Sequence, residues 1–159
     1  MLQKKFLKYI FIFFALGVFF PRYPVFASIN LVKIKESPTI YYLDGEKSRH
    51  VFPNEITYQS WYGGDYSKVA IVSKEYLSKI PLGRNVTVRP GKFLVKVPSD
   101  PRVYVVESGG ALRQLADEVI AEEFYGAHWG KKVIDIAEVF FDNYIVSDPI
   151  QKSYDVPNS

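Results

Sequence analysis

The sequence predicts an α+β domain made of two similar units that share one core, each unit being a β-hairpin followed by two short helices. The main observation is a repeated pattern: IYYLDGEKSRHVFPNE at 40–55 returns as VYVVESGGALRQLADE at 103–118. In both copies, two short β-rich runs flank a turn that contains glycine, as in a hairpin. A residue type that commonly caps a helix then follows, Asn54 in the first copy and Asp117 in the second.

The first 27 residues predict a signal peptide. Three lysines precede an uncharged apolar run at 9–20, and Val25-Phe26-Ala27 places small residues where a signal peptidase cuts. The run has 12 residues, whereas a membrane-spanning helix needs about 20. We therefore expect cleavage after Ala27 and a secreted, periplasmic or cell-surface protein. The alternative is that the segment is retained as an anchor, which would then be the protein's contact with the membrane.

The rest of the chain predicts a single domain at 28–150 and a flexible tail at 151–159. It carries 16 basic and 17 acidic side chains, because four of the 20 basic residues and none of the acids lie in the first 27 positions. This balance offers no basic surface, so we expect no nucleic-acid partner. The chain has no cysteine, which excludes disulfides and leaves the hydrophobic core to stabilise the fold.

The two units are expected at 37–83 and 100–147, with a linking hairpin at 85–97. The pairing uses a spacing of 63 to 64 residues, with one-residue shifts after Asp44 and at Pro53. A hairpin with two short helices buries too little apolar surface to be stable alone, so we expect the units to complete one core. The pairs are Pro38/Pro101, Tyr41/Tyr104, Gly45/Gly109, Arg49/Arg113, Val51/Leu115, Glu55/Glu118, Tyr62/Tyr125, Gly63/Gly126 and Val69/Val133.

The local pattern places the remaining elements in order. An alternating run at 31–35 predicts an edge strand ahead of the first hairpin. The first helix of each unit should end at Gly63 or Gly126 in a left-handed cap, which glycine adopts readily. A second helix at 74–79 should follow its capping residue, Ser73. The expected buried residues are Tyr76, Leu77 and Ile80 on this helix, Ala116, Ile120 and Phe124 on the first helix of the second unit, and Phe140, Phe141 and Tyr144 at the equivalent of the second helix.

A set of short motifs occurs in a fixed order: Pro81-Leu82-Gly83, Asn85-Val86-Thr87, Arg89-Pro90-Gly91, Phe93-Leu94-Val95-Lys96, Val103-Tyr104, Gly109-Gly110, Arg113 and Tyr125-Gly126. This set resembles a repeat of uncharacterised exported, cell-surface-associated bacterial proteins, over about residues 37–150. The resemblance implies export and a module built from repeats, and it implies no activity or catalytic residue. The first unit departs from the pattern, because Asp44-Gly45-Glu46 replaces the double glycine.

The sequence gives little support for catalysis. It has no thiol, no serine in a Gly-x-Ser-x-Gly motif and no phosphate-binding or dinucleotide-binding loop. His50 and His128 are isolated, whereas zinc needs about three or four ligands at short spacing, so we expect no metal and no cofactor. The acids at 117–123 predict a solvated helix face. The alternative is that Glu118 and Glu122 form the carboxylate pair of a hydrolase.

Two arginines, Arg49 and Arg113, are predicted to be structural. Each alternates with an apolar residue along its strand, so its stem should lie on the edge of the core with its guanidinium on a carboxylate. Glu55 and Glu118 are the expected partners. The alternative is that these guanidinium groups contact an anionic ligand.

Aromatic side chains near the ends of the first helices are the candidate binding residues. Such rings stack on the apolar faces of sugars, although rings at helix ends also pack into cores. The segment 61–66 should be the more exposed, because adjacent rings on a glycine-rich segment cannot all point inward. The candidates are Trp61, Tyr62, Tyr66, Tyr125 and Trp129, with Phe124 at the position that corresponds to Trp61.

These features predict an exported, non-catalytic module that binds a glycan or protein partner at or outside the cell surface. The first alternative is a small carboxylate-dependent hydrolase directed at wall glycan. The second is a structural protein that assembles edge to edge in the envelope. The sequence leaves the identity of the partner and the oligomeric state open.

Overall fold

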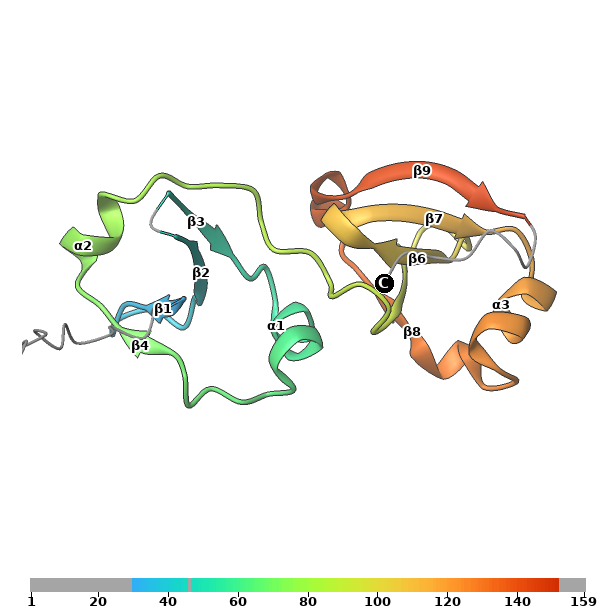
Figure 1. The fold of residues 1–159 in the computed structure, drawn as a ribbon, viewed down its shortest axis with the longest axis horizontal. Helices are drawn as coiled ribbons and strands as arrows, with labels where there is room; N and C mark the ends of the chain where they lie inside the picture. The colour runs from blue at the N-terminus through green and yellow to red at the C-terminus, as the bar shows by residue number, and fades with distance from the viewer. Residues whose placement is uncertain (1–29, 46, 152–159) are drawn as a thin grey trace, which may run out of the picture.

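The computed structural model describes residues 30–45 and 47–151 (Figure 1). The predicted signal peptide and positions 152–159 of the predicted tail lie outside this range. The predicted α+β class is confirmed: two β-sheets are combined with short helices. None of the helices in the described ranges is long and apolar enough to cross a membrane.

The first half contains a four-stranded sheet in the order β3-β2-β1-β4. Its elements are β1 (Leu31–Lys33), β2 (Tyr41–Asp44), β3 (Ser48–Val51), α1 (Glu55–Tyr62), β4 (Ala70–Ile71) and α2 (Lys74–Ser78). The expectation of an edge strand at 31–35 is wrong, because β1 pairs with β2 on one side and β4 on the other. The burial of β1 fits this central position, since Val32 is fully buried and Leu31 nearly so.

The second half contains a five-stranded sheet in the order β8-β5-β6-β7-β9. Its elements are β5 (Leu94–Lys96), β6 (Tyr104–Glu107), β7 (Ala111–Leu115), α3 (Glu118–Tyr125), β8 (Val133–Asp135) and β9 (Ile145–Ile150), with 3₁₀ helices at Ser108–Gly110, Trp129–Lys132 and Glu138–Asn143. Figure 1 shows the two sheets in separate halves, with α1 on the side of the first half that faces the second.

The two sheets follow the same path with the same register. Tyr41 on β2 lies opposite Val51 on β3, and Tyr104 on β6 lies opposite Gln114 on β7, so the spacing between equivalent residues is 63 throughout both hairpins. The predicted shifts after Asp44 and at Pro53 are therefore wrong. The spacing becomes 64 only after the first helix, where Val32 faces Ala70 and Val95 faces Ile134.

This register corrects one predicted equivalence in particular. Arg49 lies opposite Leu43, and Leu112 lies opposite Val106, so Leu112 is the structural counterpart of Arg49. By the same pairing, His50 is the counterpart of Arg113. The other shifted pairs, Gly45/Gly109 and Val51/Leu115, fail for the same reason. A slip of one residue along a strand moves every side chain to the opposite face, so the two arginines have different environments.

A fifth segment lies beside the first sheet where β9 lies beside the second. Leu82 forms a parallel bridge with Arg49, and the Val86 amide donates to the carbonyl of Val51. In the second half β9 pairs in parallel with β7 over most of its length. The first half therefore repeats the path of the second with a less regular last strand.

The predicted single shared core is not what the described residues form. Their buried side chains make four clusters, two in each half. In the first half Val32 packs with the α2 side, while Leu31 packs with Tyr58 of α1 on the other face. In the second half Val95 and Leu94 likewise pack into different clusters on opposite faces of the sheet. Because neighbouring strand residues point to opposite faces, each sheet needs a cover on both sides, and each half supplies its own.

The predicted linking hairpin at 85–97 is also wrong in its first arm. Only its second arm is a strand, β5, and this strand pairs with β6 and β8. The amides of the first arm have other acceptors: that of Val86 donates to Val51, that of Val88 to the Tyr144 hydroxyl and that of Arg89 to Ser60 Oγ. The segment is therefore held by both halves instead of folding back on itself.

The start of each first helix is as expected. Asn54 Oδ1 accepts the Thr57 amide at 2.8 Å, and Asp117 Oδ1 accepts the Ile120 amide at 2.9 Å. The two ends differ. Gly63 has the predicted left-handed conformation (φ 61°, ψ 20°). Gly126 has φ 79° and ψ 171° instead, a region that is essentially restricted to glycine.

The predicted buried faces are partly right. Leu77 and Ile80 are buried beside the first sheet, but Tyr76 is 41% exposed because it points away from that face of α2. On α3 the buried residues are Ile120 and Ala121. Ala116 is exposed because it precedes the helix, Phe124 is half-buried, and a 3₁₀ helix replaces the second helix expected in the second half.

Candidate functional site

In each half a groove lies beside the first turn of the first helix. The first groove has a volume of about 440 Å³ and is lined by residues 38–40, 52–55, Tyr58 and Tyr66. The second has about 260 Å³ and is lined by residues 101–103, 114–118, Ala121 and Trp129. All nine positions that line the first groove recur in the second at a spacing of 63. The same backbone frame therefore forms the same depression twice.

The wall of the first groove is aromatic. Tyr66 stacks on Tyr58 with the ring centroids 4.7 Å apart and the planes 10° from parallel, and Phe52 meets Tyr58 edge-on. The Tyr66 hydroxyl donates to Glu55 Oε1 at 3.3 Å, and Gln59 Nε2 donates to the same oxygen at 2.8 Å. Partial burial and the Glu55 carboxylate raise the pKa of Tyr66. The groove thus presents a fixed ring, 46% exposed, beside a held carboxylate.

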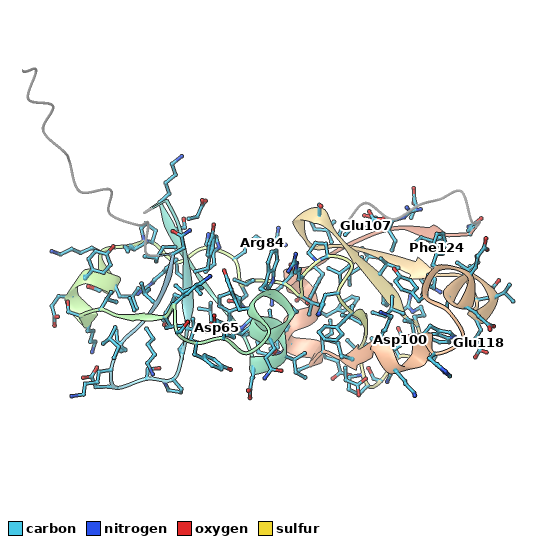
Figure 2. The ribbon with its side chains drawn as sticks, turned by 60° about the horizontal axis from the view of Figure 1, so that its bottom comes forward. Asp65, Arg84, Asp100, Glu107, Glu118 and Phe124 are labelled. Atoms are coloured by element: carbon cyan, nitrogen blue, oxygen red, sulfur yellow. The ribbon has the colours of Figure 1, made fainter. Side chains whose placement is uncertain are left out.

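The wall of the second groove is more charged. Trp129 takes the place of Tyr66, and Ala121 takes the place of the buried Tyr58. Arg102, where the first groove has Thr39, forms an ion pair with Asp100 and lowers the pKa of that carboxyl through its hydrogen bonds. Figure 2 shows Asp100 and Glu118 on the second half of the molecule. An aromatic ring and an acid are therefore common to both grooves.

A third depression lies between the two halves. This cleft has a volume of about 380 Å³, with Tyr42, Asp44, His50 and Trp61 from the first half and Gly109, Gly110 and Asn143 from the second. The rest of its lining is the connecting segment 84–87 with Pro90. Figure 2 shows Arg84 where the halves meet.

Hydrogen bonds hold the walls of the cleft in place. Trp61 Nε1 donates to the Thr87 carbonyl at 2.8 Å, and the Arg89 guanidinium lies 5.9 Å from the centre of the Trp61 ring. Arg84 donates to the Asn143 carbonyl at 3.0 Å. The cleft is therefore a defined surface that needs both halves.

The structure separates the five predicted binding residues. Trp61 lines the cleft, Tyr66 the first groove and Trp129 the second. Tyr62 and Tyr125 line none of these and pack inward instead, Tyr62 against Phe52 and Tyr58 and Tyr125 against the second-half core. Burial raises the pKa of both phenols, with smaller contributions from Tyr42 for Tyr62 and Glu107 for Tyr125. These two rings are partly buried and pack against the core clusters of their halves.

Both arginines contact other groups of the fold, but their predicted carboxylate partners are wrong. Arg49 donates to the Leu77 carbonyl at 2.8 Å and lies over the Tyr41 ring, and its buried Nε has no hydrogen-bond acceptor. The Glu55 carboxylate instead accepts hydrogen bonds from Tyr66 and Gln59. Arg113 Nη1 donates to Glu107 Oε1 at 3.4 Å, and Arg113 Nε donates to the Asp148 carbonyl at 3.0 Å. Neither Glu55 nor Glu118 forms an ion pair in the part of the chain that the structure describes.

The acids of α3 are not gathered around one groove. Glu118 lines the second groove, whereas Glu122 is exposed and lines none of the three depressions. Asp117 is engaged as the helix cap. Within residues 30–45 and 47–151 no group of three or more His, Asp or Glu side chains is placed to hold a metal ion.

Tyr58 and, apart from Trp61, the lining of the cleft were not predicted from the sequence. Tyr58 lies four residues before Tyr62 on a helix, which was a readable signal for a shared aromatic face. The cleft gave no such signal, because its lining runs from Tyr42 to Asn143 and meets only in the folded chain.

Comparison with protein-family models, with curated proteins and with solved structures gives no significant match to this chain. The resemblance to repeats of exported proteins therefore stays a prediction from the motifs alone.

Proposed function

We propose that this protein is an exported, non-catalytic module that binds a repeating polymer at the cell surface, with an envelope glycan as the polymer. The observation that supports this proposal is the recurrence of the first groove, position by position, in the second half. A polymer presents the same chemical unit at intervals, so one molecule can occupy two similar grooves.

The common chemistry of the grooves suits a sugar. Tyr66 and Trp129 each offer an aromatic surface on which the apolar face of a pyranose ring stacks. Glu55 and Glu118 beside them are acceptors for sugar hydroxyls. Asn54 and Asp117 fix the first turn of each helix, so these groups are positioned by rigid structure.

The proposal is tested by the binding of purified protein to insoluble envelope glycan. Tyr66→Ala and Trp129→Ala should each weaken binding by about tenfold, or about 1.4 kcal/mol, because each removes the aromatic surface of one groove. The double variant should lose more, since two linked contacts raise avidity well above either one. Binding is measured by co-sedimentation over a range of protein concentrations.

Tyr76→Ala is the matched control, because Tyr76 is similarly exposed (41%) but lies on α2, outside both grooves. It should bind like the wild type. Unchanged binding of the double variant, or binding to envelope proteins but to no glycan, would refute the proposal.

A further inference from the structure

The cleft between the halves has a different chemistry from the grooves. We propose that it binds a carboxylated sugar of the uronic-acid type. This site is separate from those of the proposed function, because it shares no lining residue with either groove.

Trp61 supplies the apolar surface of the cleft. Its indole N–H is already engaged by the Thr87 carbonyl, and Arg89 lies over the ring. The ring is thus fixed in orientation, and 39% of the residue is still exposed. A fixed ring of this kind binds the apolar face of a sugar without first losing rotamer freedom.

Arg84 supplies an available positive charge. Its side chain is exposed and is held by one hydrogen bond, from Nη2 to the Asn143 carbonyl. No carboxylate of the described residues forms an ion pair with it. A guanidinium carries five N–H donors and matches a carboxylate with two parallel hydrogen bonds. The remaining donors of Arg84 therefore suit the acid group of a ligand.

His50 and Asp44 supply acceptors for hydroxyl groups. The His50 ring nitrogen Nδ1 lies 2.7 Å from the Arg84 carbonyl oxygen. A carbonyl only accepts, so Nδ1 is the donor of this bond, and Nε2 is an acceptor whenever the ring carries a single proton. Asp44 lies exposed in the lining, and it forms no ion pair with Arg84.

This combination selects one class of ligand. A simple anion such as phosphate gains from Arg84 but makes no use of the Trp61 ring. A neutral sugar uses the ring and the acceptors and leaves Arg84 without a partner. A sugar acid uses all of these groups, and the volume of about 380 Å³ is within the usual range for small-ligand sites.

The chain's two tryptophans make the test specific, because Trp61 reports on the cleft and Trp129 on the second groove. Their indole N–H signals in a ¹⁵N correlation spectrum are assigned with Trp61→Phe and Trp129→Phe. Purified protein is then titrated with glucuronate, glucose, acetate and inorganic phosphate. Glucuronate should move the Trp61 signal and leave the Trp129 signal in place, with an affinity at least about tenfold above that for glucose.

Arg84→Gln should bring the affinity for glucuronate down to that for glucose, and Lys74→Gln, an exposed lysine on α2, should leave it unchanged. The proposal is overturned if glucuronate leaves the Trp61 signal unmoved, if Arg84→Gln binds it like the wild type, or if acetate or phosphate binds equally well. Should Arg84→Gln fail to fold, the ratio of glucuronate to glucose affinity in the wild type decides. A shift of the Trp129 indole signal on addition of glycan reports on the second groove and not on the cleft. The two proposals can therefore fail separately.

Discussion

The two halves of the molecule have the same frame and different groove chemistry. The inner strands β1 and β5 both read Leu-Val-Lys, and in each strand the leucine and valine side chains are buried on opposite faces. Around this shared centre the first groove is lined by stacked tyrosines, whereas the second has a tryptophan and an arginine. The inner strands are therefore the same in both halves and give the chain the same path, whereas the groove positions carry different side chains.

The hairpins show the same contrast inside the sheets. Leu112 on β7 is fully buried, whereas its counterpart Arg49 on β3 is half-buried and packs over Tyr41. The second sheet is completed by the full strand β9, whereas the first has in that place an irregular segment with the bridge at Leu82 and a hydrogen bond from the Val86 amide to the Val51 carbonyl. The second half should therefore depend more on apolar packing at this position.

The largest expected effect tests this difference directly. Leu112→Ala should lower the free energy of unfolding by about 2–5 kcal/mol, because it leaves a cavity among buried side chains. Arg49→Ala should cost less, about 1–2 kcal/mol, since it removes one hydrogen bond and a half-buried stem. Urea unfolding measures both, and equal costs would show that the two positions are not distinguished by burial.

A smaller effect is expected at the ion pair of the second half. Arg113→Ala should cost about 1–3 kcal/mol, because Glu107, 9% exposed, would keep a charge without its cation. Adding Glu107→Gln should recover part of the loss. His50, at the equivalent position of the first half, has no buried acid among the described residues as its partner. His50→Ala should therefore cost less stability than Arg113→Ala. A melting curve of Arg113→Ala that overlays the wild-type curve would rule out a structural role for Arg113.

The helix caps should behave alike in the two halves. Asn54→Ala and Asp117→Ala each remove an acceptor of a first-turn amide, so each should cost about 1 kcal/mol. Val119→Ala, 73% exposed on α3, should change stability by less than about 0.5 kcal/mol. Chemical denaturation measures the free energy of unfolding of the three variants. A marked difference between the two cap variants would mean that the two first helices are stabilised differently although the strand registers agree.

The last expected effect is a dependence on pH and concerns Tyr144, whose hydroxyl accepts the Val88 amide of the connecting segment. Burial raises the pKa of this phenol above its usual 10.0. The unfolded chain then releases the proton first, so the stabilisation is complete below pH 10.0 and is lost as the pH rises above that value. Tyr144→Phe should flatten this alkaline loss. Unfolding curves from about pH 8 to about pH 11 measure it, and a parallel decline in both proteins would exclude Tyr144 as a cause.

Features encoded within a few neighbouring residues could be predicted from the sequence. The cap at Asn54, the left-handed Gly63 and the hairpin turns depend on local backbone chemistry, and the exposed rings of Trp61 and Tyr66 follow from a glycine-rich segment. The register was harder, because matching Arg49 with Arg113 gives more identities than the true spacing, although it turns the strand over. Partners that come from distant segments, such as Glu107 for Arg113 or Asn143 for Arg84, have no local pattern.

The connection between the halves has a mechanical consequence. The halves follow one another along the chain and are joined covalently only through the segment at 84–89, which is also bonded to Ser60, Asn143 and Tyr144. Tension applied between residues 30 and 151 must therefore pass through this joint. A molecule bound between Trp61 and the Gly109 turn would brace the joint, and pulling the halves apart would in turn weaken its hold, because the coupling works equally in both directions.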